Sequence, residues 1–197
     1  MKSKIAGIIL IIGSLWYMIA ETISAFSFKD TLANTYLIHT ISELGIPNLN
    51  SPLFFLMNSA FILIGLTLII GSFYKFKDFI TKNRIPYYIF TVICGVGVII
   101  VGLIHAGNPV ALTYHALGAV MAILGGNILL VIISRSMDKF EAYQKVTLVL
   151  GIIGLIAFWI MFFSMGNIYM PVLERLSVYT LIIWNFMTGV YLFKGLF

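Results

Sequence analysis

Six apolar runs, each long enough to cross a bilayer, decide what this chain can fold into. The runs lie near residues 5–26, 52–73, 86–105, 109–133, 146–165 and 171–193. A transmembrane helix needs about 20 apolar residues, and a backbone inside lipid must satisfy its own hydrogen bonds, which a helix does. We therefore expect an all-α protein, a polytopic transmembrane bundle of six helices in which residues 1–197 form a single integral membrane domain.

The composition agrees with this class, because 61% of the residues are hydrophobic and only 10% are charged. Soluble domains are about 45–50% apolar and about 25% charged. The first run follows Met1-Lys-Ser-Lys, as in a signal peptide, but it is longer than a typical signal core and lacks a convincing cleavage site. We therefore interpret it as a retained helix. The one cysteine, Cys94, cannot form an internal disulfide.

The positively charged residues behind the formal charge of +5 are unevenly divided between the two predicted sides of the membrane. If the N-terminus is cytoplasmic, ten of the twelve lysines and arginines fall inside, and only Lys29 and Arg175 fall outside. This asymmetry predicts a cell-membrane protein with both termini cytoplasmic. The basic excess attracts anionic lipid head groups, so we expect membrane lipids as partners and no nucleic acid. A membrane-protein partner or a homo-oligomer stays open.

The longest connection, residues 28–51, is predicted to be external and contains an amphipathic segment. Its apolar residues recur at helical spacing, at Leu32, Tyr36, Leu37, Ile41 and Leu44. This spacing predicts an interfacial helix near 31–44, with Asp30 capping its start and Gly45 at its end. Such a helix lies in the membrane interface or folds over the bundle as a lid.

Polar side chains interrupt four of the runs near their predicted external ends. They are Glu21, Asn58, His115, Glu174 and Arg175. From the helix rise they lie about 5–9 Å below the membrane surface, where an unpaired charge costs on the order of 2.5–3.5 kcal/mol. We therefore expect them to converge in one layer. Intramembrane ionisable groups mark functional sites by default.

Three more side chains are placed at the rim above this layer. His39 and Glu43 are four positions apart, so they are neighbours on a helix surface, and His105 ends the third run. With the layer below, they offer imidazole, carboxylate and guanidinium groups on one side of the membrane.

General acid–base catalysis is the chemistry that these residue types suit best. His115 is the candidate catalytic base, with Glu21 or Glu174 to orient it. Arg175 can bind an anionic group of a substrate. The remaining candidates for substrate binding are His39, Glu43, Asn58 and His105. Of these, His39 and Glu43 are expected to gate access to the site.

A metal site and a purely structural layer are the alternatives. Zinc accepts imidazole and carboxylate ligands, here from His39, Glu43, His105 and His115, although the last two differ in predicted depth by about 5–6 Å. Bis-histidine haem fits less well, because no two histidines face each other at one level. In the structural alternative Glu21 and Arg175 form a buried ion pair and the other groups hydrogen-bond across helices. The sequence leaves the cofactor undetermined.

A series of short motifs runs through the chain in a recognisable order. It consists of Ser42-Glu43-Leu44-Gly45, Ser51-Pro52 with Asn58, His115-Ala-Leu-Gly118-Ala119, and Glu174-Arg175 before an aromatic-rich last helix. In this series the chain resembles the six-helix prokaryotic membrane family catalogued as domain of unknown function 998, over nearly its whole length. The resemblance implies the six-helix fold and singles out Glu43, Asn58, His115, Glu174 and Arg175. It implies no activity, since the family is uncharacterised.

Three functions remain open from the sequence. The first is a lipid or small-molecule hydrolase, acting at an outward-facing His/Glu/Arg pocket in the outer leaflet. The second is a non-catalytic accessory or structural subunit of a larger membrane complex, in which the polar layer only holds the helices together. The third is a small-molecule transporter, which is weakened because the inner half offers only Asn127 and Asn185 as its main polar candidates.

Overall fold

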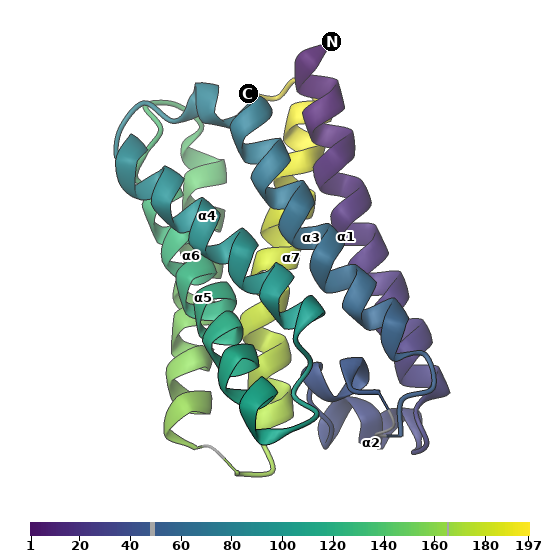
Figure 1. Cartoon of the computed structure of the whole chain (residues 1–197). Coiled ribbons are helices and arrows are strands. Elements are labelled where there is room, and N and C mark those ends of the chain that lie inside the picture. The colour runs from purple at the N-terminus through teal and green to yellow at the C-terminus, as the bar shows by residue number, and fades with distance from the viewer. Residues whose placement is uncertain (48–49, 165) are drawn as a thin grey trace.

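Six long helices run through the computed structural model, which describes residues 1–47, 50–164 and 166–197. They are α1 (Lys2–Ser27), α3 (Phe54–Tyr74), α4 (Arg84–Leu103), α5 (Pro109–Ile133), α6 (Glu141–Phe163) and α7 (Met170–Lys194) (Figure 1). All six are long and apolar enough to cross a membrane. The prediction of an all-α, six-span, multi-pass membrane protein is confirmed.

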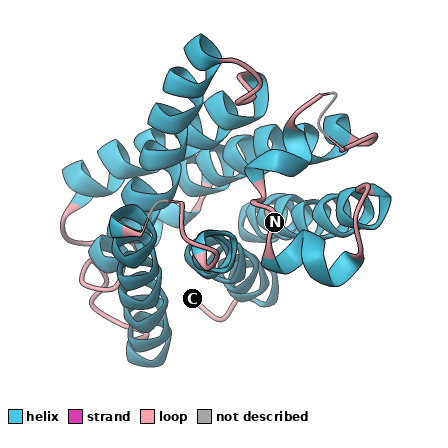
Figure 2. Cartoon of the chain, turned by 90° about the horizontal axis from the view of Figure 1, so that it is seen from below, coloured by secondary structure: helices cyan, strands magenta, loops and turns pink. Residues whose placement is uncertain are grey.

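The helices form a ring in chain order. Each helix packs against the next one, from α1 with α3 through α6 with α7, and α7 returns to pack against α1. The two chain termini lie together at one end of this ring, and the short helix α2 (Leu32–Leu37) lies at the other (Figure 1). We call these the termini end and the α2 end. Figure 2 shows the ring from below, along the helices.

Glycines let neighbouring helices of the ring approach backbone to backbone. A Cβ added at Gly97 of α4 would lie 2.6 Å from the amide nitrogen of Ala122 and 2.7 Å from the carbonyl oxygen of Gly118, both on α5. A Cβ at Gly7 of α1 would lie 2.6 Å from the carbonyl oxygen of Gly189 on α7. Without a hydrophobic drive between helices in lipid, such close packing is what holds spans together.

The connection between α1 and α3 is not the single helix near 31–44 that the spacing predicts. It contains α2, a turn, and one turn of 3₁₀ helix, η1 (Ser42–Gly45). The side chain of Thr31 caps α2 by accepting a hydrogen bond from the Asn34 amide. The helix stops early because its carbonyl groups find another donor. The guanidinium of Arg175 donates to the carbonyl oxygens of Thr35, Tyr36 and His39.

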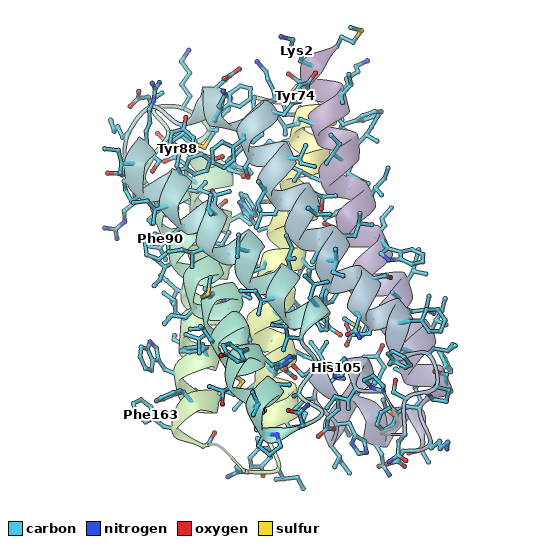
Figure 3. All side chains as sticks on the ribbon, viewed as in Figure 1. Lys2, Tyr74, Tyr88, Phe90, His105 and Phe163 are labelled. Carbon is cyan, nitrogen blue, oxygen red and sulfur yellow. The ribbon has the colours of Figure 1, made fainter. Side chains whose placement is uncertain are left out.

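Helix ends at the α2 end decide which backbone groups are free. The third span ends at Leu103, before the predicted end at His105, so the Ile104 carbonyl has no partner within the helix. Asn108 caps α5 as its position before Pro109 suggests, accepting from the Ala111 amide at 2.9 Å. The α2 end, where His105 lies (Figure 3), therefore combines a loop, an open helix end and buried polar side chains.

Candidate functional site

Ser42 is the residue on which the polar side chains of the α2 end converge. It opens η1, and its hydroxyl oxygen lies 3.0 Å from Nε2 of His115 on α5. The same oxygen lies 3.1 Å from Oε1 of Glu174 on α7. The hydroxyl therefore bridges an imidazole and a carboxyl group that come from two different spans.

The backbone fixes the orientation of the His115 ring. Nδ1 donates to the carbonyl oxygen of Ile104 at 2.7 Å, an acceptor left free by the early end of α4. A carbonyl can only accept, so Nδ1 carries a hydrogen. In the neutral ring Nε2 then holds the lone pair that faces Ser42. This is the arrangement in which a histidine can take a proton from a serine hydroxyl.

Glu174 binds the turn that carries Ser42. Its Oε2 accepts from the amide of Ile41 at 2.7 Å, and its Oε1 faces the Ser42 hydroxyl. Ser42 has one hydroxyl hydrogen and cannot donate to both neighbours. All contacts of the trio are satisfied only when either Glu174 or His115 carries one further proton. We call this hydrogen-bonded chain of His115, Ser42 and Glu174 the relay.

Glu21 and Arg175 form a buried ion pair beside this relay, as the structural alternative predicts. Nε of Arg175 donates to Oε1 of Glu21 at 3.2 Å, and the Tyr179 hydroxyl donates to the same oxygen at 3.0 Å. Both side chains of the pair are buried, at 1% and 6% exposure. Glu21 thus contacts Arg175 and Tyr179, and His115 receives its orientation from the Ile104 carbonyl.

The remaining donors of Arg175 hold the α1–α3 connection. Nη1 donates to the carbonyl oxygens of His39 at 2.7 Å and Tyr36 at 3.1 Å, and Nη2 to that of Thr35 at 3.4 Å. The guanidinium also lies 4.9 Å from the centre of the Tyr36 ring, a cation–π distance. With its fork directed at protein acceptors, Arg175 acts here as a clamp. Its role in binding an anionic substrate group stays a prediction.

His39 lies at the surface of the connection between two carboxylates. Nδ1 lies 2.8 Å from Oε2 of Glu43, and Nε2 lies 3.2 Å from Oδ2 of Asp30. The Asn34 side chain, the Thr31 amide and His39 hydrogen-bond to the Asp30 carboxylate and lower its pKa. His39 and Glu43 are neighbours as expected, although the turn brings them together instead of a shared helix.

The last two candidates, Asn58 and His105, lie next to the same connection. Nδ2 of Asn58 donates to the carbonyl oxygen of Gly45 at 2.9 Å. Gly45 is close-packed there, since an added Cβ would collide with Oδ1 of Asn58. Nδ1 of His105 is buried without a hydrogen-bond partner among the described residues. Their proposed role in substrate binding stays a prediction.

Among the described residues, no group of three His, Cys, Asp or Glu side chains is arranged to hold a metal ion. His39 illustrates why proximity is not sufficient. Its Nε2 faces Asp30 and its Nδ1 faces Glu43, on opposite sides of the ring. One metal ion therefore could not bind a single ring nitrogen and both carboxylates.

A cavity begins at Ser42 and Glu174 and continues along the inside of the ring. Its volume is about 70 Å³, well below the range of about 300–1,000 Å³ for small-molecule sites, so the cavity is narrow. Aliphatic and aromatic side chains line most of it, and Asn185 and Trp184 line its far part. Residues 174 and 185 are 11 positions apart on α7, about 16 Å along the axis.

The sequence singles out His115 and Glu174 but not Ser42, which contacts both of them, or Tyr17, which lines the cavity. Ser42 becomes central only because the connection folds back onto α5 and α7, which helical periodicity does not predict. A signal was present, because Ser42 opens the first of the motifs that carry the family resemblance. Tyr17 lines the cavity one turn from Glu21, and its hydroxyl has no hydrogen-bond partner among the described residues.

The comparisons with known proteins support a family and no activity. A search of curated proteins and a search of solved structures each gave no match. The model of a family described as "Protein of unknown function (DUF998)" matches residues 11–191, which is most of the chain. The resemblance noted from the motifs is thereby confirmed, and the chain belongs to the DUF998 family of multi-pass membrane proteins.

Proposed function

We propose that this protein hydrolyses a lipid-like acyl ester, with Ser42 as the nucleophile and His115 as the general base. The observation that carries the proposal is the 3.0 Å separation between the Ser42 hydroxyl and Nε2 of His115, at the polar end of an apolar cavity. A nucleophile within hydrogen-bond reach of a base that a third group orients is the common signature of acyl transfer. Here the third group is the Ile104 carbonyl.

The reaction needs no group beyond those at the site and water. With the additional proton on Glu174, whose Oε1 then donates to the Ser42 oxygen, the Ser42 hydroxyl donates to Nε2 of His115. Ser42 Oγ attacks the carbonyl carbon of the ester while that hydroxyl proton passes to Nε2. The tetrahedral intermediate expels the alcohol, which takes that proton from the imidazolium, and leaves the acyl group on Ser42. A water molecule, deprotonated by His115, then attacks the acyl-serine, releases the carboxylic acid and returns the hydroxyl to Ser42.

Glu174 is a positioning residue in this scheme. It holds the amide of Ile41 at 2.7 Å and so fixes the turn immediately before the nucleophile. The clamp of Arg175 on the carbonyls of the same connection keeps that turn against the bundle. One span, α7, therefore sets the position of Ser42, and a second, α5, supplies the base.

The Tyr17 hydroxyl is our candidate donor for the ester oxygen as it becomes an oxyanion. It is a buried donor that lines the cavity and is without a hydrogen-bond partner among the described residues. A donor aimed at developing negative charge contributes about 10²–10³-fold to the rate. Tyr17→Phe removes this hydroxyl alone, so it should lower kcat while leaving assembly intact.

The charge distribution of the sequence predicts that the α2 end is external, which would put the proposed substrate in the outer leaflet. A reporter protein that is active on only one side of the membrane, fused at the C-terminus, tests this orientation. A cytoplasmic reporter signal supports it, and a periplasmic or extracellular signal would move the site to the inner leaflet.

Labelling with an alkyl fluorophosphonate tests the nucleophile. The reagent phosphonylates activated serines with loss of fluoride, so the purified protein should be labelled at Ser42. Ser42→Ala should remove the label and His115→Gln should slow it strongly. Ser24→Ala is the matched control, because the Ser24 hydroxyl donates to the Leu53 carbonyl and lies outside the relay. Equal labelling of the wild type and Ser42→Ala would refute the assignment.

A non-catalytic membrane subunit is the second candidate, and one observation favours it. Most polar groups at the α2 end are bonded to the α1–α3 connection, so they have a structural task that needs no substrate. The same labelling experiment separates the two candidates. A correctly assembled wild-type protein that never reacts with the probe supports the structural function.

A further inference from the structure

We propose that His39 is a pH-sensitive latch, which holds the α1–α3 connection closed over Ser42 while its imidazole is protonated and releases it when the imidazole is neutral. Such a latch regulates the proposed hydrolase site, so its effect on Ser42 rests on the proposed function. The movement of the connection does not rest on it and is tested without a substrate.

The site is closed to an ester in this structure. Ser42, in η1 of the connection, contacts His115 and Glu174, which are only 5% and 8% exposed. The cavity behind them has a volume of about 70 Å³, which is too small for a lipid-like ester. An ester therefore reaches the Ser42 hydroxyl only after the connection has moved away from α5 and α7.

His39 ties the start of the connection to η1. Its Nε2 lies 3.2 Å from Oδ2 of Asp30, which precedes α2, and its Nδ1 lies 2.8 Å from Oε2 of Glu43 in η1. The ring of Phe28, just after α1, packs on the imidazole with 4.7 Å between the ring centres. One side chain thus joins three separate parts of the polypeptide at the α2 end.

Only the imidazolium satisfies both contacts of the His39 ring. A neutral imidazole has one N–H and one lone pair, so one of its nitrogens would face a carboxylate oxygen with no hydrogen between them. Hydrogen bonds lower the pKa of Asp30, so its carboxylate stays ionised and cannot supply that hydrogen. Histidine is the side chain whose charge ordinarily changes between about pH 5 and 8. Loss of the proton therefore breaks the tie between Asp30 and Glu43.

Glu43 connects the latch to the turn that carries Ser42. The same Oε2 that contacts His39 accepts from the amide of Thr40 at 3.2 Å, and the Glu43 amide donates to the Thr40 hydroxyl at 3.2 Å. This reciprocal pair is a capping box, and Ser42 lies within the turn that it frames. When Glu43 is no longer held to Asp30 through His39, this turn is less firmly attached to the start of the connection.

The charged groups around His39 leave control of the latch to its own proton. Asp30 and Glu43 face the ring nitrogens and favour the protonated form. From α7, Nη1 of Arg175 donates to the backbone carbonyl oxygen of His39 at 2.7 Å. The charge of this guanidinium is balanced by its buried partner, Glu21.

Two substitutions shift the latch in opposite directions. Asp30→Asn places an amide where Oδ2 was, and this amide donates to the lone pair of a neutral Nε2. Its Oδ1 still accepts from the Thr31 amide and from the Asn34 side chain. Because Nδ1 then donates to Glu43, we expect this variant to stay closed at every pH. His39→Gln never carries the charge, so we expect it to stay open.

The mobility of a nitroxide spin label beside His39 measures the latch without a substrate. Ile38 is exposed, and the single native cysteine, Cys94, is 1% exposed, so the label attaches at Ile38→Cys. In phospholipid nanodiscs the ratio of mobile to immobile label should rise about threefold to tenfold between about pH 5 and 8. The step should be absent from His39→Gln and Asp30→Asn. Asp78→Asn, at the termini end, is the matched control and should keep it.

The rate of fluorophosphonate labelling at Ser42 tests the regulation. Any titration of His115 is common to all the proteins, so each rate is divided by that of the wild type at the same pH. His39→Gln should be labelled about threefold to tenfold faster than the wild type near pH 5 and equally fast near pH 8. Asp30→Asn should match the wild type near pH 5 and be slower by a similar factor near pH 8.

The two measurements separate the latch from the hydrolase. A wild type without a mobility step, or a step that persists in both variants, overturns the latch even where Ser42 is labelled. A mobility step in a protein that never reacts with fluorophosphonate keeps the latch and overturns the hydrolase. A step accompanied by rate ratios of one at both pH values overturns the regulation of Ser42. Where one variant fails to assemble, the other still decides, because each must lose the step.

Discussion

The two ends of the bundle both bury polar side chains, but they use them differently. Towards the termini end the partners are neutral and join one helix to another. Nδ2 of Asn185 on α7 donates to the Leu10 carbonyl and to Ser14 on α1, and the Tyr143 hydroxyl lies 2.7 Å from that of Thr188. At the α2 end the partners are ionisable and bind a non-helical segment.

The backbone explains this difference. A helix satisfies its own carbonyls, so a neutral hydrogen bond between spans is only an addition to packing. The α1–α3 connection breaks its helix early and leaves carbonyls that need donors in a poorly hydrated place. Arg175 supplies three of them and needs the Glu21 carboxylate to balance its charge. The ionisable groups therefore gather where irregular backbone meets the membrane layer.

The largest expected effect is on catalytic activity, which only the variant at the α2 end should lower. Equal effects of variants at both ends would contradict the comparison. We expect His115→Gln to lower the rate of acyl-ester hydrolysis by about 10²–10⁴-fold, the usual contribution of a general base. Tyr143→Phe removes a buried hydrogen bond of the termini end and should leave that rate within about threefold, since Tyr143 does not line the cavity. Turnover of a chromogenic acyl ester by the purified protein measures both. A full rate with His115→Gln contradicts the proposed base.

Next in size is the stability of the clamp. Arg175→Met removes one partner of a buried ion pair, which costs about 3–5 kcal/mol because the other charge stays buried and unpaired. Arg135→Met changes an exposed arginine of the termini end and should cost less than about 0.5 kcal/mol. Unfolding by dodecyl sulfate in mixed micelles measures both. Similar losses for the two variants would show that the guanidinium of Arg175 is not the clamp.

The sequence predicts the spans well and the connection poorly, for a physical reason. Span positions depend on local apolar runs, so α1, α3 and α5 begin and end within a few residues of expectation. The connection depends on Arg175, far along the chain, which takes the carbonyls that a helix through residues 31–44 would use itself. Periodicity within the connection carries no trace of that contact.

In the candidate site, too, the sequence predicts what depends on local pattern and not what depends on tertiary contacts. The sequence places Glu21, His115 and Arg175 in one buried layer because charge in lipid must be paired. It leaves open which carboxylate meets which base. That choice follows from the Ile104 carbonyl, exposed by the end of α4 at Leu103, and from the fold that puts Ser42 between His115 and Glu174. Both are tertiary features.

A smaller effect is expected from the neutral pairs. Nδ2 of Asn127 donates to the Ser177 carbonyl at 3.1 Å, and its Oδ1 accepts from the Thr180 hydroxyl at 2.8 Å. Asn127→Leu should cost about 0.6–1.7 kcal/mol, the range measured for hydrogen bonds between spans. The same mixed-micelle unfolding measures it. A loss as large as that for Arg175→Met would erase the distinction between the two ends.

The smallest effect sharpens the comparison at the surface of the α2 end. Hydrogen bonds from the Asn34 side chain, the Thr31 amide and His39 lower the pKa of Asp30. A lowered pKa means that the folded form stabilises the carboxylate. This contribution is complete above the ordinary aspartate pKa of about 4 and is lost as the pH falls through the lower, folded-state value.

The α1–α3 connection should therefore keep its protection from proteases between neutral pH and about pH 4, and lose part of it only below. Asp30→Asn should remove this acid-dependent step, because its side chain no longer titrates. Asp78→Asn is the control at the termini end, where Asp78 pairs with Lys75 at 2.9 Å and touches nothing in the connection. Limited proteolysis with an acid-stable protease across this pH range measures the step. If the step persists in Asp30→Asn, another carboxylate such as Glu43, which shares His39 with Asp30, controls how firmly the connection is held.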